Sequence, residues 1–445
     1  MVVREEKLTM TYPVIEEIFE IIDVRGRQIV DSRGNPTIEV DVVTRGGFGR
    51  AAAPAGASKG KYEALELRDG GREFHGRGVG KAVWNVNNII APALRGMDSR
   101  RQRDIDYKMI ELDGTRNKSR LGANAIIATS LAVAKAAAST YGMWLYEYLG
   151  GLNAKVMPVP LMNFINGGVH AGNKLDIQEF MILPLNADTF CDALRIAIEV
   201  YHELKQYLKE KYGLQAINIG DEGGFAPPMT NTREALNALI GAIKRAGYGP
   251  GSDVALALDV AASQLYSYKT KTYSIDGKSF TAEELMDYFM ELINEYPIVS
   301  IEDPFMEDDF QSFAKLLGKV KGKILIVGDD LFVTNIDRLR KGIEYRSCNA
   351  ILVKVNQIGT LTEAIEVINE AHDVGYRAII SHRSGETEDT TIAHLAVAFN
   401  TGLIKTGAPA RGERTAKYNE LLRIEERLGS EAKYPGWKIL PGKPS

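Results

Sequence analysis

Three acidic residues each follow a short apolar run in the second half of the chain. Asp259 follows VALAL, Glu302 follows IVSI and Asp329 follows ILIVG. Carboxylates are costly in a low-dielectric site unless they are paired or bound to a cation, and three that converge repel one another. All-oxygen ligation selects a hard divalent ion, and Mg²⁺ fits best. The pattern therefore predicts a metal site, although a single such acid could equally cap a helix or form a surface ion pair.

The next three apolar runs end in basic or neutral-base residues. Lys354 follows AILV, His382-Arg383-Ser384 follow AIIS, and Lys405 follows GLI. A guanidinium fork and a hydroxyl, as in Arg383 and Ser384, suit a phosphate or carboxylate group. Lys354 is a candidate general base, because nearby cations would lower its pKa, and the alternative is a lysine that only pairs with the carboxylates.

Loop segments add further candidates. INIGDEGGFAPP places Glu222 in a Gly/Pro-rich loop, where it could do acid–base work, although composition alone favours a simple turn acid. NGGVHAGNKLDIQEF places His170 in a loop and Glu179 on the following strand, and a lone histidine is usually structural or solvated. DSRGNP, which contains Ser32, and PAGASKGKYE are polar loops that could serve as lids or as chain punctuation only.

The spacing of the six apolar runs predicts the elements that hold these residues. Their terminal residues are 43, 27, 25, 28 and 23 positions apart, about the length of a strand, a helix and two loops. Near-continuous apolar strands indicate a parallel sheet covered on both faces. Repeated units over ~250 residues predict an eight-stranded barrel with its active site at the C-terminal ends of the strands. A doubly wound open sheet is the alternative, but no GxGxxG follows any predicted strand.

The first third of the chain has a different pattern. Ile38, Val40 and Val42 alternate with acidic residues, which predicts a half-buried strand of a small antiparallel sheet. Helices are expected over 78–96 and 100–112, and either one long Ala-rich helix or a helix pair over 122–149. A strand pair in PVPLMNFIN and DIQEFMILP and helices over 187–212 and 231–247 are expected to follow. YSYKTKTYSIDGKSF is expected to form a hairpin that turns at Asp276-Gly277. The segment GGLNAKVMPVP is the best boundary. We therefore expect an N-terminal extension (1–16), an α+β domain (17–150) and a catalytic barrel domain (151–445).

Composition narrows the class of protein. The chain has 445 residues, 45% hydrophobic and 25% charged, as in an ordinary globular protein. Its 54 Lys and Arg against 58 Asp and Glu give a net charge of −4, without the basic excess of a nucleic-acid binder. The sequence contains no run of 18 apolar residues, so no membrane span is predicted. Two cysteines and no apolar core of a secretory signal predict a cytoplasmic protein without disulfides.

Ten segments along the chain resemble the enolase family. They are DSRGNPTIEV (31–40), YEALELRD (62–69), KSRLGANAI (118–126), NGGVHAGN (166–173), GDEGGFAP (220–227), IEDPF (301–305), GDDL (328–331), VKVNQIGTL (353–361), SHRSGETED (381–389) and IKTGAPARGER (404–414). They span nearly the whole chain in order. The resemblance implies a lyase of glycolysis and gluconeogenesis that reversibly dehydrates 2-phosphoglycerate to phosphoenolpyruvate with two Mg²⁺ per site.

The resemblance also implies roles for the candidate residues. Lys354 matches the base that takes the C2 proton, and Glu222, with Glu179 beside it, matches the acid that helps the 3-hydroxyl leave. Lys405 matches a group that faces the substrate carboxylate. The implied metal ligands are Asp259, Glu302, Asp329 and the lid residue Ser32. The implied substrate contacts are His170, Glu179, Glu302, Asp329, Lys354, His382, Arg383, Ser384 and Lys405, with Arg383 and Ser384 at the phosphate and the loop residue His170 near it.

The implied fold is an N-terminal α+β domain followed by an eight-stranded barrel that begins ββαα. Relatives are usually dimeric and sometimes octameric, and some have a second role at the cell surface. The first-domain loop departs from the usual SGAST and reads Ala55-Gly56-Ala57-Ser58-Lys59, with an added charge at Lys59. A racemase or muconate-lactonising enzyme would carry a Lys-x-Lys pair at a strand end, whereas Lys209 and Lys211 lie in an expected helix. A non-catalytic binding protein is the other alternative, but no matched site residue is missing.

Overall fold

A three-stranded antiparallel sheet opens the part of the chain that the computed structural model describes, residues 17–57 and 60–442. Its strands are β1 (Ile21–Val30), β2 (Pro36–Thr44) and β3 (Phe48–Ala52), in that order. Ile38, Val40 and Val42 are buried in β2, as their alternation predicted. The expected extension at 1–16 and two residues of the expected lid loop, Ser58 and Lys59, lie outside the described ranges.

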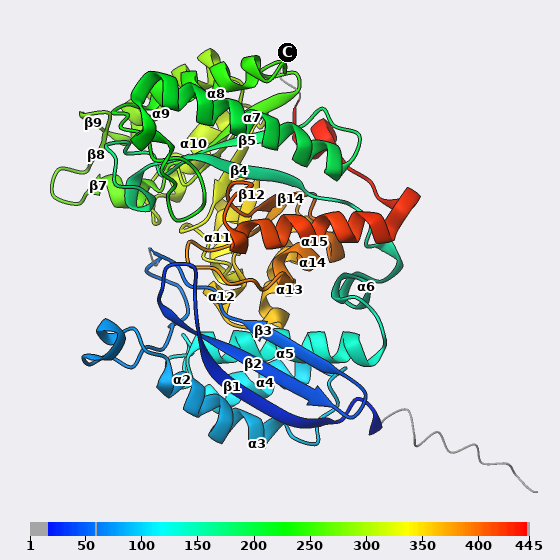
Figure 1. Cartoon of the computed structure of the whole chain (residues 1–445). Helices are drawn as coiled ribbons and strands as arrows, with labels where there is room; N and C mark the ends of the chain where they lie inside the picture. The colour runs from blue at the N-terminus through cyan, green and yellow to red at the C-terminus, as the bar shows by residue number, and fades with distance from the viewer. Residues whose placement is uncertain (1–16, 58–59, 443–445) are drawn as a thin grey trace, which may run out of the picture.

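Helices and short helical turns complete the first part of the chain, and most of them lie against this sheet (Figure 1). They are η1 (Glu73–Gly76), α2 (Gly80–Asn85), the π-turn η2 (Val86–Ile90), α3 (Ala91–Leu94), α4 (Gln102–Asp113), α5 (Ala123–Thr140), α6 (Leu145–Gly150) and η3 (Gly151–Asn153). The Ala-rich helix α5 packs closely on β2 and β3. A Cβ on Gly49 would lie 2.1 Å from the carbonyl oxygen of Ala132, so only glycine permits this approach.

Eight strands close into a barrel, which confirms the predicted fold. They are β4 (Val159–Asn166), β5 (Glu179–Pro184), β6 (Val254–Asp259), β10 (Ile298–Glu302), β11 (Leu325–Gly328), β12 (Ala350–Val353), β13 (Arg377–Ser381) and β14 (Leu403–Lys405). β5 runs antiparallel to both β4 and β6, and the other neighbours are parallel. Alternate residues of all eight strands, such as Leu161, Met181 and Leu352, form a separate buried cluster inside the barrel.

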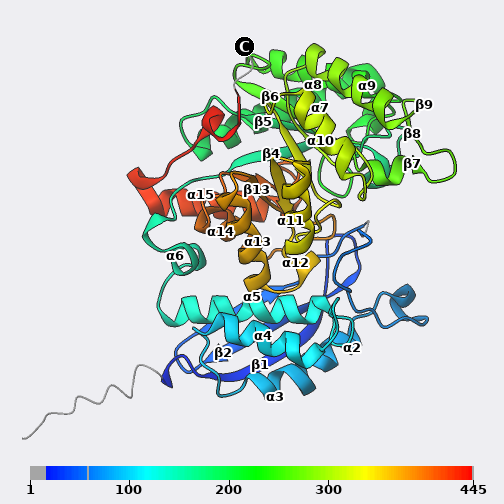
Figure 2. The same cartoon turned by 180° about the vertical axis from the view of Figure 1, so that it is seen from behind.

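The helices surround the barrel and cover its outer face (Figures 1 and 2). They are α7 (Phe190–Tyr212), α8 (Thr232–Arg245), α9 (Ala282–Glu295), α10 (Phe310–Lys319), α11 (Ile336–Tyr345), α12 (Val355–Ile358), α13 (Leu361–Asp373), α14 (Thr391–Ala398) and α15 (Gly412–Leu428). Short 3₁₀ turns join them: η4 (Gly168–His170), η5 (Leu214–Ile217), η6 (Ala262–Leu265), η7 (Gly429–Glu431) and η8 (Gly436–Ile439). The order β4-β5-α7-α8-β6 is the expected ββαα start. Within the described residues, no helix combines the length and apolarity that crossing a membrane requires.

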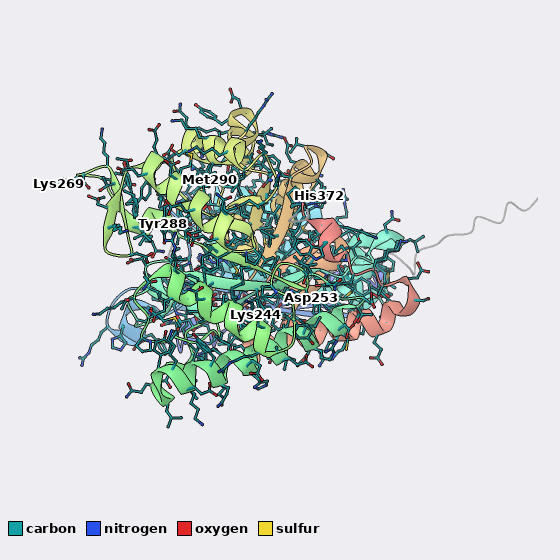
Figure 3. All side chains as sticks on the ribbon, turned by 90° about the horizontal axis from the view of Figure 1, so that it is seen from above. Lys244, Asp253, Lys269, Tyr288, Met290 and His372 are labelled. Carbon is teal, nitrogen blue, oxygen red and sulfur yellow. The ribbon has the colours of Figure 1, made fainter. Side chains whose placement is uncertain are left out.

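The expected hairpin between β6 and α9 is present as β7 (Tyr266–Ser267), β8 (Thr272–Ile275) and β9 (Lys278–Phe280). Its turn lies at Asp276 and Gly277, whose φ angles of 53° and 71° suit a tight hairpin turn. Figure 3 shows Lys269, in the β7–β8 connection, at the outer edge of the molecule. The hairpin therefore extends away from the barrel as a surface feature.

A partly buried ion pair joins the two parts of the molecule. Lys135 of α5 lies 2.7 Å from Asp389, which follows β13 in the barrel. Asp389 also accepts hydrogen bonds from the backbone N–H groups of Thr391 (2.7 Å) and, in β3, Ala52 (3.2 Å). Burial alone would raise the pKa of Asp389, but Lys135 and these donors outweigh it and lower that pKa to about 2.

We propose the domain division at residues 150 and 151, between α6 and the barrel.

Replacing Asp389 with Asn is expected to destabilise the protein by about 1–3 kcal/mol at pH 7, because it leaves the partly buried ammonium of Lys135 without its counter-charge. A carboxyl group whose pKa is lower in the folded protein than in the unfolded chain stabilises the fold at pH values above its unfolded pKa, which is about 4. For Asp389 this stabilisation is lost as the pH falls toward 2. Urea unfolding at pH 7 and pH 3 measures both effects. As a control, Glu210→Gln, in an exposed pair with Arg245, is expected to change stability by less than about 0.5 kcal/mol. An equal effect of both variants would contradict this assignment.

Candidate active site

Three carboxylates lie side by side across the mouth of the barrel. The strand register pairs Asp259 of β6 with Glu179 of β5 on one side and with Glu302 of β10 on the other. Because β5 is antiparallel to β6, its first residue lies at the same end as the last residues of β6 and β10. All three side chains are buried. The antiparallel start of the barrel thus aligns Glu179 with two of the predicted strand-end acids.

The ammonium of Lys405 reaches across the mouth into this carboxylate row. Its Nζ lies 2.9 Å from Oδ2 of Asp259, 2.9 Å from both oxygens of Glu302 and 3.2 Å from Oε1 of Glu179. Burial would lower the pKa of Lys405, but the three acids outweigh it and raise that pKa well above its usual value. Burial and the neighbouring acids raise the pKa values of Glu179 and Glu302. One lysine therefore only partly offsets the repulsion among the three acids, and Glu179 and Glu302 respond by favouring their neutral forms.

The second lysine, Lys354, pairs with Asp329. Its Nζ donates to Oδ2 of Asp329, whose Oδ1 accepts a 3.1 Å hydrogen bond from Gln357. Burial, Arg383 and Lys405 each lower the pKa of Lys354, but the adjacent Asp329 outweighs them and the net shift is upward. The expectation that nearby cations leave Lys354 with a lowered pKa is therefore wrong for this arrangement, because the contact with Asp329 favours the ammonium form.

Glu222 lies in a buried cluster with two histidines. Oε2 of Glu222 accepts a 3.0 Å hydrogen bond from Asn163, and its Oε1 lies 3.5 Å from Nδ1 of His170 and 3.5 Å from Nε2 of His382. Neither of these two ring nitrogens has a hydrogen-bond partner within the described structure. Burial lowers the pKa of His382 to about 3, which keeps its ring neutral at pH 7. Glu222 and His170 are thus buried side chains facing each other, neither a surface turn acid nor a solvated histidine.

Arg383 and Ser384 lie on the same mouth at the end of β13. Arg383 donates to both oxygens of Glu63, at 3.1 Å each, and to Oδ1 of Asn356 at 3.1 Å. The hydroxyl of Ser384 accepts a 2.7 Å bond from the backbone N–H of Ala57. Residues of the first part of the chain therefore contact both predicted anion-binding groups.

Ser32 forms hydrogen bonds with the segment after β13 and with Arg411, and it is not among the described residues that line the cavity at the barrel mouth. Its hydroxyl donates to the carbonyl of Ser384 at 3.4 Å and accepts the backbone N–H of Glu386 at 3.1 Å. Its carbonyl accepts a 2.9 Å bond from Arg411. Ser32 thus joins the first sheet to the segment after β13, and its predicted metal contact stays a prediction that would require these partners to be released.

Most predicted residues surround one cavity at the barrel mouth. Its lining includes these candidates: His170, Glu179, Glu222, Asp259, Asp329, Lys354, His382, Arg383, Ser384 and Lys405. Gln178, which donates to Asp259 at 3.1 Å, also lines it and was missed, although it directly precedes Glu179 in the sequence. Glu63 and Arg414, which support Arg383 and His382, were also missed, although both lie in segments that resemble the enolase family, 62–69 and 404–414.

The donor chemistry fits a hard divalent cation. Ligand atoms of Asp303, Asp329 and Asp330 lie within 4.8 Å of one another, as do those of His170, Glu179 and Glu222. Asp303 is committed to the backbone N–H groups of Asp329 (2.9 Å) and Asp330 (2.7 Å), so it holds the turn that presents Asp329. Burial and Asp329 raise the pKa of Asp330 to about 7. Crowded carboxylates with raised pKa values are those that gain most from a bound cation.

Comparison with known proteins identifies the family. Residues 21–149 match the family described as "Enolase, N-terminal domain", and residues 154–441 match "Enolase, C-terminal TIM barrel domain". The chain belongs to the enolase family. It is 60% identical over 422 residues to the enolase of Pyrococcus furiosus, covering 95% of this chain and 98% of that protein. The enolases of Methanocaldococcus jannaschii (60% over 423 residues, 95% and 98%) and Thermococcus kodakarensis (59% over 425 residues, 96% and 99%) are similarly close.

Family membership confirms the expected class of protein. The chain is an enolase-family lyase that acts on a small molecule, and the family acts with a divalent metal. The racemase-type alternative fails on the same evidence, and Lys209 and Lys211 lie in α7 and not at a strand end. The acidic groups at the barrel mouth supply the oxygen ligands that such a metal requires.

Replacing Asp329 with Asn is expected to weaken Mg²⁺ binding at least about tenfold, because it removes a charged oxygen from the group best placed to hold the ion. Isothermal calorimetry with Mg²⁺ measures the affinity. The control is Asp308→Asn, since Asp308 is a partly exposed acid that pairs with Tyr62. Unchanged affinity in the Asp329 variant would remove it from the ligand set.

Proposed function

We propose that the protein reversibly dehydrates 2-phosphoglycerate to phosphoenolpyruvate and water. One observation carries the chemistry: Lys354 and the Glu179–Glu222 pair line the same cavity from opposite walls. β12, which Lys354 follows, and β5, which begins with Glu179, are four strands apart in either direction around the barrel. A base and an acid on opposite sides of a substrate suit the removal of a proton from one carbon and of hydroxide from the next.

The base is Lys354. A neutral Nζ takes the proton from C2, the C2–H electrons form the C2=C3 double bond, and the C3–oxygen bond breaks. The contact with Asp329 favours the protonated lysine, so the base becomes active when the charge of Asp329 is taken up by another cation. The same lysine returns the proton in the reverse reaction.

The acid is Glu222, with Glu179 beside it. Hydroxide is a poor leaving group, and a proton delivered by Glu222 lets it depart as water. Asn163 holds one oxygen of Glu222 and leaves the other directed toward the two histidines in the cavity. His170, a buried neighbour of Glu222, and His382 complete this wall.

Anionic groups of the substrate are held by the basic residues. Lys405 faces the substrate carboxylate, whose charge increases when C2 loses its proton, and the phosphate contacts Arg383 and Ser384. The same cavity is lined by three further predicted substrate contacts, Asp329, Lys354 and His382. The fourth, Glu302, contacts the lining residue Lys405. A cationic group at each end of a small dianion fixes its orientation relative to Lys354.

The metal is Mg²⁺, with two ions per active site. Asp259, Glu302 and Asp329 would hold the first, and Ser32 in the first-domain loop the second. When bound, the ions stabilise the negative charge that accumulates on the substrate carboxylate. Lys405 supplies part of the same stabilisation from the protein, because its ammonium is fixed within the carboxylate row.

The proposed reaction also bears on the cellular location, and the family on the oligomeric state. We propose that the protein works in the cytoplasm, where its substrates are made, and that a secondary pool at the cell surface is compatible with this role. We propose a homodimer, with an octamer as the alternative. Analytical ultracentrifugation of the full chain distinguishes the two.

The reaction is tested by the absorbance increase of phosphoenolpyruvate formed from 2-phosphoglycerate, with and without Mg²⁺. Turnover that requires Mg²⁺ is expected. A folded, Mg²⁺-saturated sample without turnover would contradict the proposed reaction and would favour a binding role for the same cavity.

Lys354→Ala is expected to abolish exchange of the C2 proton with solvent while Mg²⁺ still binds, because it removes the base and leaves the carboxylates in place. Proton exchange in deuterated water, followed by NMR, measures the step without requiring the full reaction. Lys341→Ala, on the exposed face of α11, serves as the control. Near-normal exchange in the Lys354 variant would overturn the base assignment.

A further inference from the structure

A carboxylate from the first part of the chain is buried at the barrel mouth without a place in the chemistry described so far. Glu63 lies in the segment between β3 and α2, and only 8% of its side chain is exposed. Oε1 of Glu63 accepts bonds from the backbone N–H of Gly60 (2.9 Å) and from Nη2 of Arg383 (3.1 Å). Its Oε2 accepts Nη1 of Arg383, also at 3.1 Å.

This contact is a two-point fork between two planar groups. Two parallel hydrogen bonds fix the plane and direction of a guanidinium, which a single bond does not. Asn356, which follows Lys354 by two positions, accepts a third bond from Nη1 of Arg383 at 3.1 Å. The orientation of Arg383 is therefore set from two directions, by Glu63 and by the segment that carries the base.

The backbone around Glu63 is itself anchored. Ala64 donates to the carbonyl of Gln357 at 2.8 Å, and Leu65 donates to the carbonyl of Asn117 at 2.7 Å. The side chain of Gln357 lies between the two halves of the site, since its Nε2 is 3.1 Å from Asp329 and 3.4 Å from Glu63. Glu63 therefore contacts the anion-binding side directly and the acidic side through one amide.

We infer that Glu63 is a positioning residue that holds Arg383 in the orientation needed to bind the substrate phosphate. The barrel site is then incomplete without the first part of the chain, because Glu63, which lies outside the barrel, orients the anion-binding Arg383. This inference rests on the proposed function for the identity of the substrate, but the fork between Glu63 and Arg383 can be tested with phosphate alone.

The direction in which Glu63→Gln changes phosphate affinity separates a positioning role for Glu63 from a purely electrostatic one. Glu63→Gln removes a negative charge next to an anion site, so electrostatics alone would strengthen phosphate binding. A positioning role predicts the opposite, because an amide accepts only one of the two guanidinium bonds and its NH₂ group repels the other. We expect Glu63→Gln to bind inorganic phosphate about tenfold more weakly and to lower kcat/KM for 2-phosphoglycerate about 10–100-fold. Glu63→Asp, which keeps the charge and both acceptor oxygens, is expected to recover part of each loss.

A matched control removes a different contact between the two parts of the molecule. Glu363 of α13 pairs with the buried Lys118 at 2.9 Å, away from Arg383. Glu363→Gln is expected to leave phosphate affinity and kcat/KM within about twofold, whatever its effect on the thermal midpoint. All variants are compared at equal folded fraction, which their thermal midpoints establish.

Phosphate affinity by calorimetry and kinetics with 2-phosphoglycerate together decide the inference. Weaker phosphate binding in Glu63→Gln, with Glu363→Gln unchanged, supports it. Unchanged or tighter phosphate binding in Glu63→Gln overturns it, as does an equal loss in both variants. If the unaltered protein binds phosphate but does not turn over 2-phosphoglycerate, the proposed function fails while the affinities still test the role of Glu63.

Discussion

The ammonium of Lys405 is the interaction on which the barrel mouth depends. It lies within 3.2 Å of Glu179, Asp259 and Glu302, three buried acids that the strand register places next to one another. Without a cation this row would raise the free energy of the folded state, because buried like charges repel in a low-dielectric setting. The site is therefore both a stability problem and a source of function, since the same unbalanced charge attracts a divalent ion.

The two lysines divide the mouth into complementary halves. Lys405 interacts with the carboxylate row, and Lys354 interacts with Asp329, which Asp303 presents by capping the turn after β11. Each lysine is held by acids that a metal would share. Charge in this cavity is consequently coupled: a change in the partners of Asp329 alters the proton affinity of Lys354. Because of this coupling, substrate binding changes the proton affinity of Lys354 without movement of the barrel strands.

Strand-end residues were predictable because a parallel barrel repeats one simple rule. Each apolar run is buried, each run ends at the same rim, and so Asp259, Lys354 and Lys405 had to meet. The antiparallel β5 brings Glu179 to that rim from the other direction, which the resemblance to the family anticipated but the spacing alone did not. The boundaries of helices were less exact: the expected 78–96 helix contains a π-turn at Val86–Ile90, which no pattern in the apolar residues signals.

Contacts between the two parts of the chain could not be predicted from local pattern. Glu63 meets Arg383 across 320 residues, and Ser32 meets Glu386 across 354. Spacing constrains neighbours within one repeated unit, whereas these contacts depend on how a separate sheet is oriented against the barrel. The net upward shift of the pKa of Lys354 is of the same kind, because it depends on which single carboxylate the ammonium finally contacts.

The central claim is that the acidic barrel mouth is the metal site, and the most direct test is to locate the ion. Anomalous diffraction from a crystal soaked in Mn²⁺ shows its position without reference to activity. The account predicts a peak at the carboxylates of the mouth that includes an oxygen of Asp329. A peak confined to other acidic groups of the surface, with none at Asp329, would contradict it.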